Sequence, residues 1–137
     1  MRQPVMLLAI STLGACASPL PPVDNKQAWV DLYTITPGKL VMAERLDGKR
    51  LTDGRFFQVT PGAHELVVRF DYEIYSGGFT TDPTGRTCYL TVKYDGFKAG
   101  QRYRLEARAP ATQPSAYLYD AQRKVVAEEA NDTFCTP

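Results

Sequence analysis

The sequence predicts an all-β protein, an antiparallel β-sandwich of roughly seven to eight short strands. Apolar and polar residues alternate with a period of two through most of the chain after Gln27, as they do in half-buried strands. Turn-forming pairs, chiefly Pro-Gly and Asp-Gly, separate the alternating segments. The 10 glycines, 10 prolines and 8 tyrosines also favour short strands over long helices.

The first strands are bounded by clear turn signals. A strand is expected at Ala28–Ile35, and Pro37-Gly38 ends it, because proline fixes φ and glycine supplies the positive φ of a type II turn. Further strands are expected at Leu40–Leu46 and Phe56–Val59, separated by Asp47-Gly48 and Asp53-Gly54.

Three longer strands follow a second Pro-Gly pair. From His64 to Ile74 every second residue is apolar and predicted to face inward, and Cys88–Tyr94 repeats the pattern. In Tyr103–Ala107 the odd-numbered residues face inward instead. A tight Ala99-Gly100 turn predicts a hairpin between these last two strands, with Asp95 opposite Arg104 and Lys93 opposite Glu106.

The last strands are expected at Ala116–Tyr119 and Lys124–Ala127, joined by a turn at residues 120–123. The segment Gln122–Ala130 also fits a short C-terminal helix, and the residue pattern leaves both readings open.

Length and charge exclude some classes of protein. A chain of 137 residues forms one ordinary domain and is too short for two. Its 16 basic and 15 acidic residues give a formal charge of +1, so we expect no nucleic-acid partner held by counterion release.

Residues 1–15 are typical of a secretory signal, with Arg2 followed by a short apolar stretch, Val5–Ile10, that is too short to span a bilayer. They end in Leu13-Gly14-Ala15-Cys16, which resembles the lipobox of bacterial lipoproteins. The resemblance implies cleavage before Cys16 and a lipid on its sulfur. An ordinary signal peptide cut near Ala15 or Ala17 is the alternative.

The predicted organisation therefore has three parts. Residues 1–15 are the cleaved signal peptide, residues 16–26 are the lipidated Cys16 and a proline-rich tether, and residues 27–137 are a single β-sandwich domain. Ala17 and Ser18 are not acidic, and among lipoproteins this favours the outer membrane of a Gram-negative bacterium. We expect the domain to face the periplasm.

The chain has three cysteines, an odd number for an exported protein. If Cys16 carries the lipid, Cys88 and Cys135 remain as a pair, and a disulfide is their expected state in the oxidising periplasm. This bond would hold the polar C-terminal tail against the strand that contains Cys88. The competing reading is a catalytic or metal-binding thiol.

The segment Thr36–Phe70 carries Pro37-Gly38, Leu46-Asp47-Gly48-Lys49 and Val59-Thr60-Pro61-Gly62, followed by a strand. In these motifs it resembles the PEGA domain, a small β module of bacterial surface proteins. The resemblance covers about a quarter of the chain. It implies an immunoglobulin-like or prealbumin-like sandwich that binds and does not catalyse.

Few residues suggest chemistry. His64 is the sole histidine, so a histidine-rich metal site is excluded, and its place after a turn favours a structural role. Asp71 and Glu73 share a face, but a solvated strand explains them better than a pair of catalytic carboxylates. The same holds for Arg102, Arg104 and Arg108, which could form an anion-binding stripe but alternate with inward residues and have Glu106 among them. We expect no enzyme activity, metal or cofactor.

Aromatic residues mark two candidate binding regions. Trp29 and Tyr33 lie four positions apart on one strand and both face solvent if Ala28, Val30 and Leu32 face inward; the reverse parity buries Trp29. The long segment Tyr75–Arg86 carries Tyr75, Phe79 and Arg86 and is either a functional loop or a merely mobile one.

The sequence thus predicts a non-catalytic outer-membrane lipoprotein that serves as a binding or accessory component of a cell-envelope assembly. Its expected partners are the membrane, through the lipid, and another envelope protein. Two alternatives remain open: a periplasmic inhibitor or immunity lipoprotein against an envelope-attacking enzyme, and a carbohydrate- or peptidoglycan-binding module.

Overall fold

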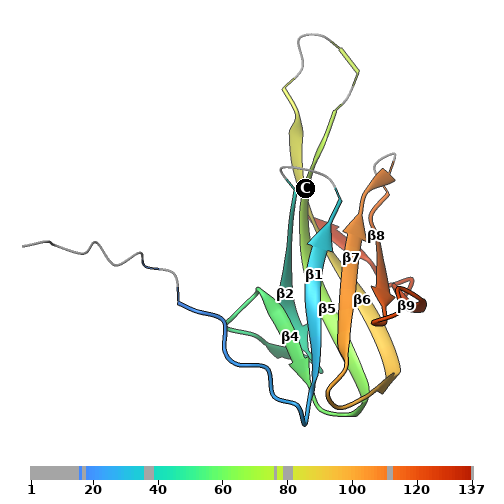
Figure 1. Ribbon diagram of the computed structural model, residues 1–137. Coiled ribbons are helices and arrows are strands. Elements are labelled where there is room, and N and C mark those ends of the chain that lie inside the picture. The colour runs from blue at the N-terminus through green and yellow to red at the C-terminus, as the bar shows by residue number, and fades with distance from the viewer. Residues whose placement is uncertain are drawn as a thin grey trace, which may run out of the picture.

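The computed structural model describes residues 16, 18–35, 39–75, 77–78, 82–110 and 113–136. Two sheets of five strands each enclose the core, so the predicted all-β sandwich is confirmed (Figure 1). One sheet has the order β4-β1-β7-β8-β9 and the other β10-β6-β5-β2-β3. The strands are β1 Ala28–Thr34, β2 Leu40–Leu46, β3 Lys49–Arg50, β4 Phe56–Val59, β5 Gly62–Ile74, β6 Thr84–Phe97, β7 Arg102–Arg108, β8 Ser115–Tyr119, β9 Val125–Glu128 and β10 Phe134–Thr136.

The first sheet is mixed, which corrects the expectation of purely antiparallel sheets. Strands β1 and β7 run parallel, with Trp29 in register with Arg102 and Tyr33 in register with Glu106. The other paired strands in the described residues are antiparallel. The parallel pair places strands far apart in the sequence side by side at the centre of the sheet.

The predicted hairpin between β6 and β7 is wrong, and with it the pairing of Asp95 with Arg104. Strand β6 pairs with β5 and β10, whereas β7 pairs with β1 and β8, so the turn at Gly100 joins the two sheets. Gly100 has a φ of 75° and donates its N–H to Gln27 at 2.9 Å. Alternation reports which residues face the core but not which strand lies alongside, and both arrangements bury the same residues.

The chain end forms strands, so the alternative of a helix at Gln122–Ala130 is wrong. Strand β9 pairs with β8, which supplies partners for its backbone. Before it, the Asp120 carboxylate accepts the N–H groups of Gln122 and Lys124, both at 2.9 Å, and closes the turn. The capped turn and the pairing with β8 thus provide hydrogen-bond partners for backbone groups that would pair within the segment if it were a helix.

The short strand β10 confirms the predicted disulfide. Cys88 of β6 and Cys135 of β10 lie directly opposite each other and are bonded, with 4.0 Å between their Cα atoms. The bond holds the last described residues against the second sheet.

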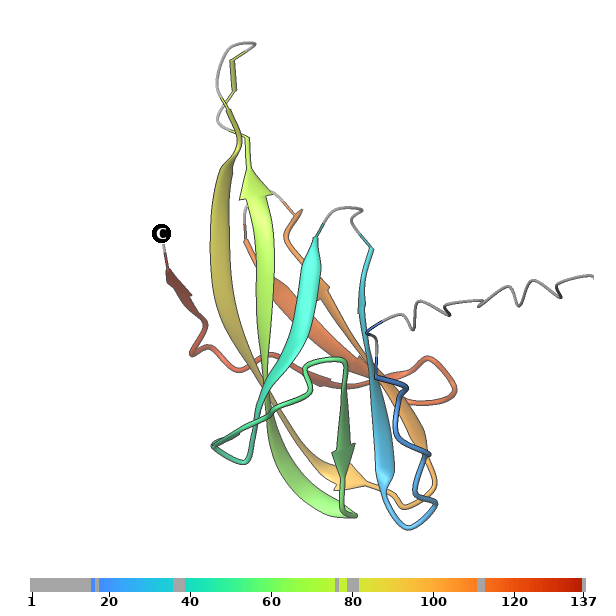
Figure 2. The ribbon, with the colours of Figure 1, turned by 90° about the vertical axis from the view of Figure 1, so that its left-hand side faces the viewer.

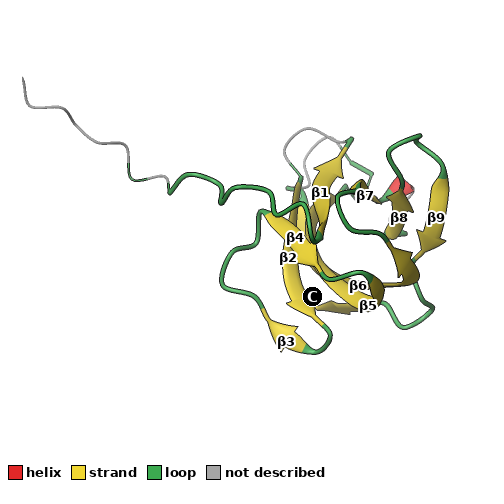
Figure 3. Cartoon of the chain, turned by 60° about the horizontal axis from the view of Figure 1, so that its bottom comes forward, coloured by secondary structure: helices red, strands yellow, loops and turns green. Residues whose placement is uncertain are grey.

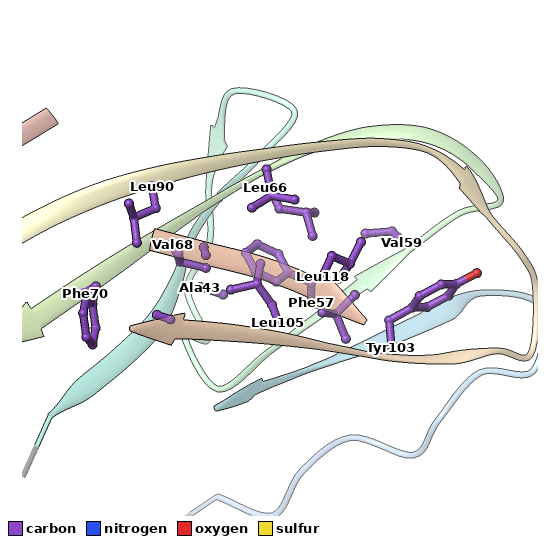
Figure 4. Close-up of a cluster of buried hydrophobic side chains, with 14 of the residues drawn as sticks. Ala43, Phe57, Val59, Leu66, Val68, Phe70, Leu90, Tyr103, Leu105 and Leu118 are labelled. Atoms are coloured by element: carbon purple, nitrogen blue, oxygen red, sulfur yellow. The ribbon is translucent and has the colours of Figure 1, made fainter. Parts of the chain in front are cut away.

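The core lies between the sheets and contains the residues that alternation predicts (Figure 4). From β5 and β6, Leu66, Phe70 and Leu90 are fully buried, and Phe57 and Leu105 meet them from the first sheet. Tyr103, Leu105 and Ala107 face inward as predicted. Because one face of each sheet packs against this core, the opposite faces are the ones that can contact solvent or partners.

Two features lie outside the sandwich. The β5–β6 hairpin extends past the ends of the neighbouring strands (Figures 1 and 2). The exposed segment before β1 approaches β4, where Arg55 donates a hydrogen bond to the Ser18 carbonyl at 2.8 Å (Figure 3). Within the described ranges no helix has the length and apolar character needed to cross a bilayer.

Candidate binding face

The outer face of the first sheet carries alternating arginine and aromatic side chains. Strand β1 contributes outward residues to it, and the parallel register sets them beside the outward residues of β7, which β8 flanks on the other side. We call this surface the arginine face; its residues are Trp29, Asp31, Tyr33, Arg102, Arg104, Glu106, Arg108, Tyr117 and Tyr119.

At one end of this face, the ring of Trp29 is covered by neighbouring side chains. Its ring stacks on Phe56 with centroids 4.3 Å apart and planes 11° apart. The Arg102 guanidinium lies 5.8 Å from the ring centroid, and the indole N–H donates to Asp31 at 3.0 Å. These contacts leave Trp29 only 3% exposed although Ala28 and Val30 face the core. Of the two parities that the sequence left open, the one with Ala28 and Val30 inward is present, but it does not expose Trp29 as it does Tyr33, because Phe56 covers the Trp29 ring.

Two tyrosine rings of this face also lie beneath arginine guanidinium groups. Arg104 lies 4.0 Å above the Tyr33 ring centroid, and Arg108 lies 5.2 Å above that of Tyr117. Arg108 also donates a hydrogen bond to the Tyr119 hydroxyl at 2.7 Å. Cation–π contacts of this kind attract the guanidinium groups to the faces of the rings. Tyr33 remains 39% exposed.

Carboxylates complete the pattern. Asp31 accepts two hydrogen bonds from Arg102, at 2.6 and 2.9 Å, and this pairing lowers the pKa of Asp31 below its ordinary value and raises that of Arg102. Glu106 is shared, at 3.6 Å from Arg104 and 3.1 Å from Arg108. The hydrogen bond that Arg108 donates to Glu106 also raises the pKa of Arg108. Each of these arginines is therefore paired with a carboxylate of the same face.

The second predicted region lies on the other sheet, away from Trp29 and Tyr33. Tyr75 follows β5, is 69% exposed and donates a hydrogen bond to Glu73 at 3.1 Å, which raises the pKa of Tyr75. Arg86 belongs to β6 and not to a loop, because β6 begins at Thr84. It lines a hollow of about 390 Å³ with Glu129 and Cys135. Phe79 lies outside the described residues.

Glu129 closes the sandwich beside this hollow. It forms a bridge with Val92 of the other sheet, and its carboxylate accepts the Ala116 N–H at 2.6 Å. Burial raises the pKa of Glu129 despite this hydrogen bond. The Glu129 carboxylate thus helps to hold the segment that joins the two sheets.

His64 borders a hollow of about 600 Å³, where β5 and β6 meet β9. Its Nδ1 lies 2.6 Å from Asp47 and its Nε2 lies 2.7 Å from the Thr60 carbonyl oxygen. The second oxygen of Asp47 accepts the Glu65 N–H at 2.8 Å, a hydrogen bond that lowers the pKa of Asp47. His64 and Asp47 are thus engaged with each other, and His64 connects two turns.

The N-terminal predictions involve few described residues. Cys16 is exposed, as are residues 18–26, which form no strand or helix. The signal peptide at residues 1–15 lies outside the described residues. Among those that are described, no cluster of histidine, cysteine or acidic side chains is placed to hold a metal ion.

Tyr117, Tyr119 and Arg123 are site residues that sequence reasoning missed. A signal was present for the tyrosines, because they alternate with Ala116 and Leu118, both fully buried. Their neighbours on β7 could not be inferred, since that depends on strand order.

No protein-family model matches the chain, and neither a curated protein nor a solved structure matches it. Its function is therefore inferred from the geometry of its surface and from the motifs of its sequence.

Proposed function

We propose that the protein is a lipid-anchored lipoprotein of the outer membrane that acts by binding, as an accessory component of a cell-envelope assembly. In this proposal Cys16 carries the lipid, residues 18–26 are the tether, and the arginine face contacts the partner. The partner is another envelope protein.

The arginine face is the observation that carries the binding role. Tyrosine, tryptophan and arginine are the residues most enriched where protein interfaces derive their affinity. Here the side chains of Arg102, Arg104 and Arg108 are 60%, 36% and 40% exposed, yet each is held by a ring and a carboxylate. Such ordered side chains lose little conformational entropy when a partner binds.

Two features support the proposed location outside the cytoplasm. The lipobox at Leu13–Cys16 implies the anchor, and the Cys88–Cys135 disulfide fits an oxidising compartment. Two or three acyl chains would hold the protein on the membrane stably.

The anchor is tested by replacing the lipidated residue. We expect Cys16→Ser to shift the protein from the membrane fraction to the soluble fraction and to remove the lipid mass seen by mass spectrometry. A variant that stays membrane-bound, with no mass difference beyond the substitution, would contradict anchoring through Cys16.

The face is tested by affinity capture of the tagged, lipidated protein from crosslinked cells. Tyr33→Ala removes an exposed ring of the arginine face, and Tyr89→Ala makes the same change on the outer face of the other sheet. Only the first is expected to reduce recovery of the partner. Equal recovery with both variants would contradict the role of the face.

An inhibitor or immunity lipoprotein is the second candidate, and the projecting β5–β6 hairpin favours it (Figure 2). Such an arm, with exposed Tyr75 near its end, has a shape suited to entering an enzyme cleft. Loss of protection against a lytic enzyme on deletion of residues 75–83 would support this candidate. Sugar stacking on Trp29 has less support, because Phe56 and Arg102 cover its ring.

A further inference from the structure

One corner of the arginine face is hollowed. Where β7 and β8 meet the turn before β9, a pocket of about 280 Å³ is lined by Arg104, Glu106, Arg108, Tyr119, Asp120 and Arg123. We call it the arginine corner. Three of its six lining residues are arginines, and they come from two separate elements.

The acidic groups of the arginine corner are already engaged. Glu106 is shared by two arginines, Arg104 and Arg108. Asp120 accepts two backbone N–H groups of its own turn. One more oxyanion would therefore meet donors that are not fully paired.

In the described part of the chain Arg108 has one unpaired donor atom, and Arg123 forms no ion pair. The Nε atom of Arg108 is buried and makes no hydrogen bond there. Arg123 has no carboxylate within 4.0 Å among those residues. A buried unpaired donor costs free energy, which an incoming acceptor oxygen would recover.

The backbone conformation of Arg123 is a further observation in favour of a site. Its φ is 62°, in the left-handed region that glycine adopts freely and that asparagine and aspartate adopt more readily than other residues. A glycine would be the less strained residue in this turn. Strain at a position whose side chain lines a pocket suggests that the side chain is needed there.

We propose that the arginine corner binds an oxyanion, a carboxylate or a phosphate group carried by the partner. Guanidinium groups bind both through paired N–H donors. The inference rests on the proposed function of the arginine face and names the chemistry that one part of it recognises.

The test is an NMR titration of the full lipidated protein in detergent micelles, followed at the arginine Nε–H signals. Sodium phosphate and sodium acetate are added in separate arms, each compared with sodium chloride at equal ionic strength. We expect a saturable shift of the Arg108 signal with at least one oxyanion and none with chloride. The tighter-bound oxyanion identifies the group carried by the partner.

Arg123→Gly is the decisive variant. It should weaken oxyanion binding at least about fivefold. The Tm should be unchanged or higher, because glycine adopts a positive φ without the steric strain that arginine has there. Loss of binding with retained stability excludes unfolding as the cause. Arg123→Gln, which keeps the first part of the side chain and removes the charged guanidinium, should weaken binding similarly. Arg50→Gln, on β3 of the other sheet with a side chain that is 77% exposed, should bind as the unmodified protein does.

Non-saturable shifts with both oxyanions, or equal binding by Arg123→Gly and the unmodified protein, would overturn this inference. The proposed function fails separately. If neither oxyanion binds but Tyr33→Ala still reduces partner capture, the face retains its role and only the oxyanion site is lost.

Discussion

Single side chains in this protein often connect elements that are distant in the sequence. Asp47 has a φ of 50° in the turn between β2 and β3, and its carboxylate contacts His64 and the Glu65 backbone at the start of β5. Aspartate tolerates this backbone region better than most residues. One carboxylate therefore joins the turn between β2 and β3 to the start of β5.

This arrangement predicts a pH-dependent contribution to stability. Asp47→Asn keeps the shape of the side chain but removes its charge, and should lower the free energy of unfolding at pH 7 by at most about 1 kcal/mol, because the group is half exposed. The pKa of Asp47 is lowered in the folded state, so its ionised form stabilises the fold, and that contribution is lost as the pH falls through this lowered pKa.

Urea unfolding at a series of pH values measures this contribution. The difference between Asp47→Asn and the unmodified protein should close in acid, below the ordinary carboxyl pKa of 3.8. A difference that stays constant over the series would contradict a charge effect and indicate a packing effect instead.

At the scale of elements, β10 depends on one covalent bond. It has three residues and pairs only with β6 in the described structure, where Cys135 lies opposite Cys88. So short an edge strand has little hydrogen-bonding stability of its own.

Replacing both cysteines with alanine should release β10. The loop closed by the disulfide spans 47 positions, so its removal should lower the free energy of unfolding by up to about 4 kcal/mol in the chain-entropy model. Hydrogen exchange should show rapid exchange of the β10 amides while the central β5 amides remain protected. Protected β10 amides in this variant would show that the strand holds without the bond.

Strand faces were predictable and strand partners were not. From His64 to Ile74, alternation identified the inward residues because a strand exposes its two faces in turn. It could not identify the crossing at Gly100 or the parallel pairing of β1 with β7. Both depend on contacts between distant residues, such as Asp31 and Arg102, which are 71 positions apart.

The candidate site was predictable to the same degree. Tyr33 and the β7 arginines stood out in the sequence as separate candidates, and the structure brings them together through strand order. The sequence left burial of Trp29 open but could not show its cause, because Phe56 reaches the Trp29 ring only through the pairing of β4 with β1.

The whole molecule places its candidate functions on different surfaces. The arginine face covers the outside of one sheet, and the hairpin beyond the sandwich belongs to the other (Figure 1). Each surface can therefore be changed without altering the other or the core between them. In the proposed arrangement, the tether leaves the domain free to orient either surface toward a partner while the lipid holds it on the membrane.

The most direct test is site-specific photocrosslinking in cells that make the lipidated protein. A photoreactive phenylalanine replaces Tyr33 on the arginine face or, as the matched control, Tyr89 on the outer face of the other sheet. The account predicts a discrete adduct with one envelope protein from position 33 and none from position 89. No adduct at position 33, or the same adduct from both positions, would contradict binding through the arginine face.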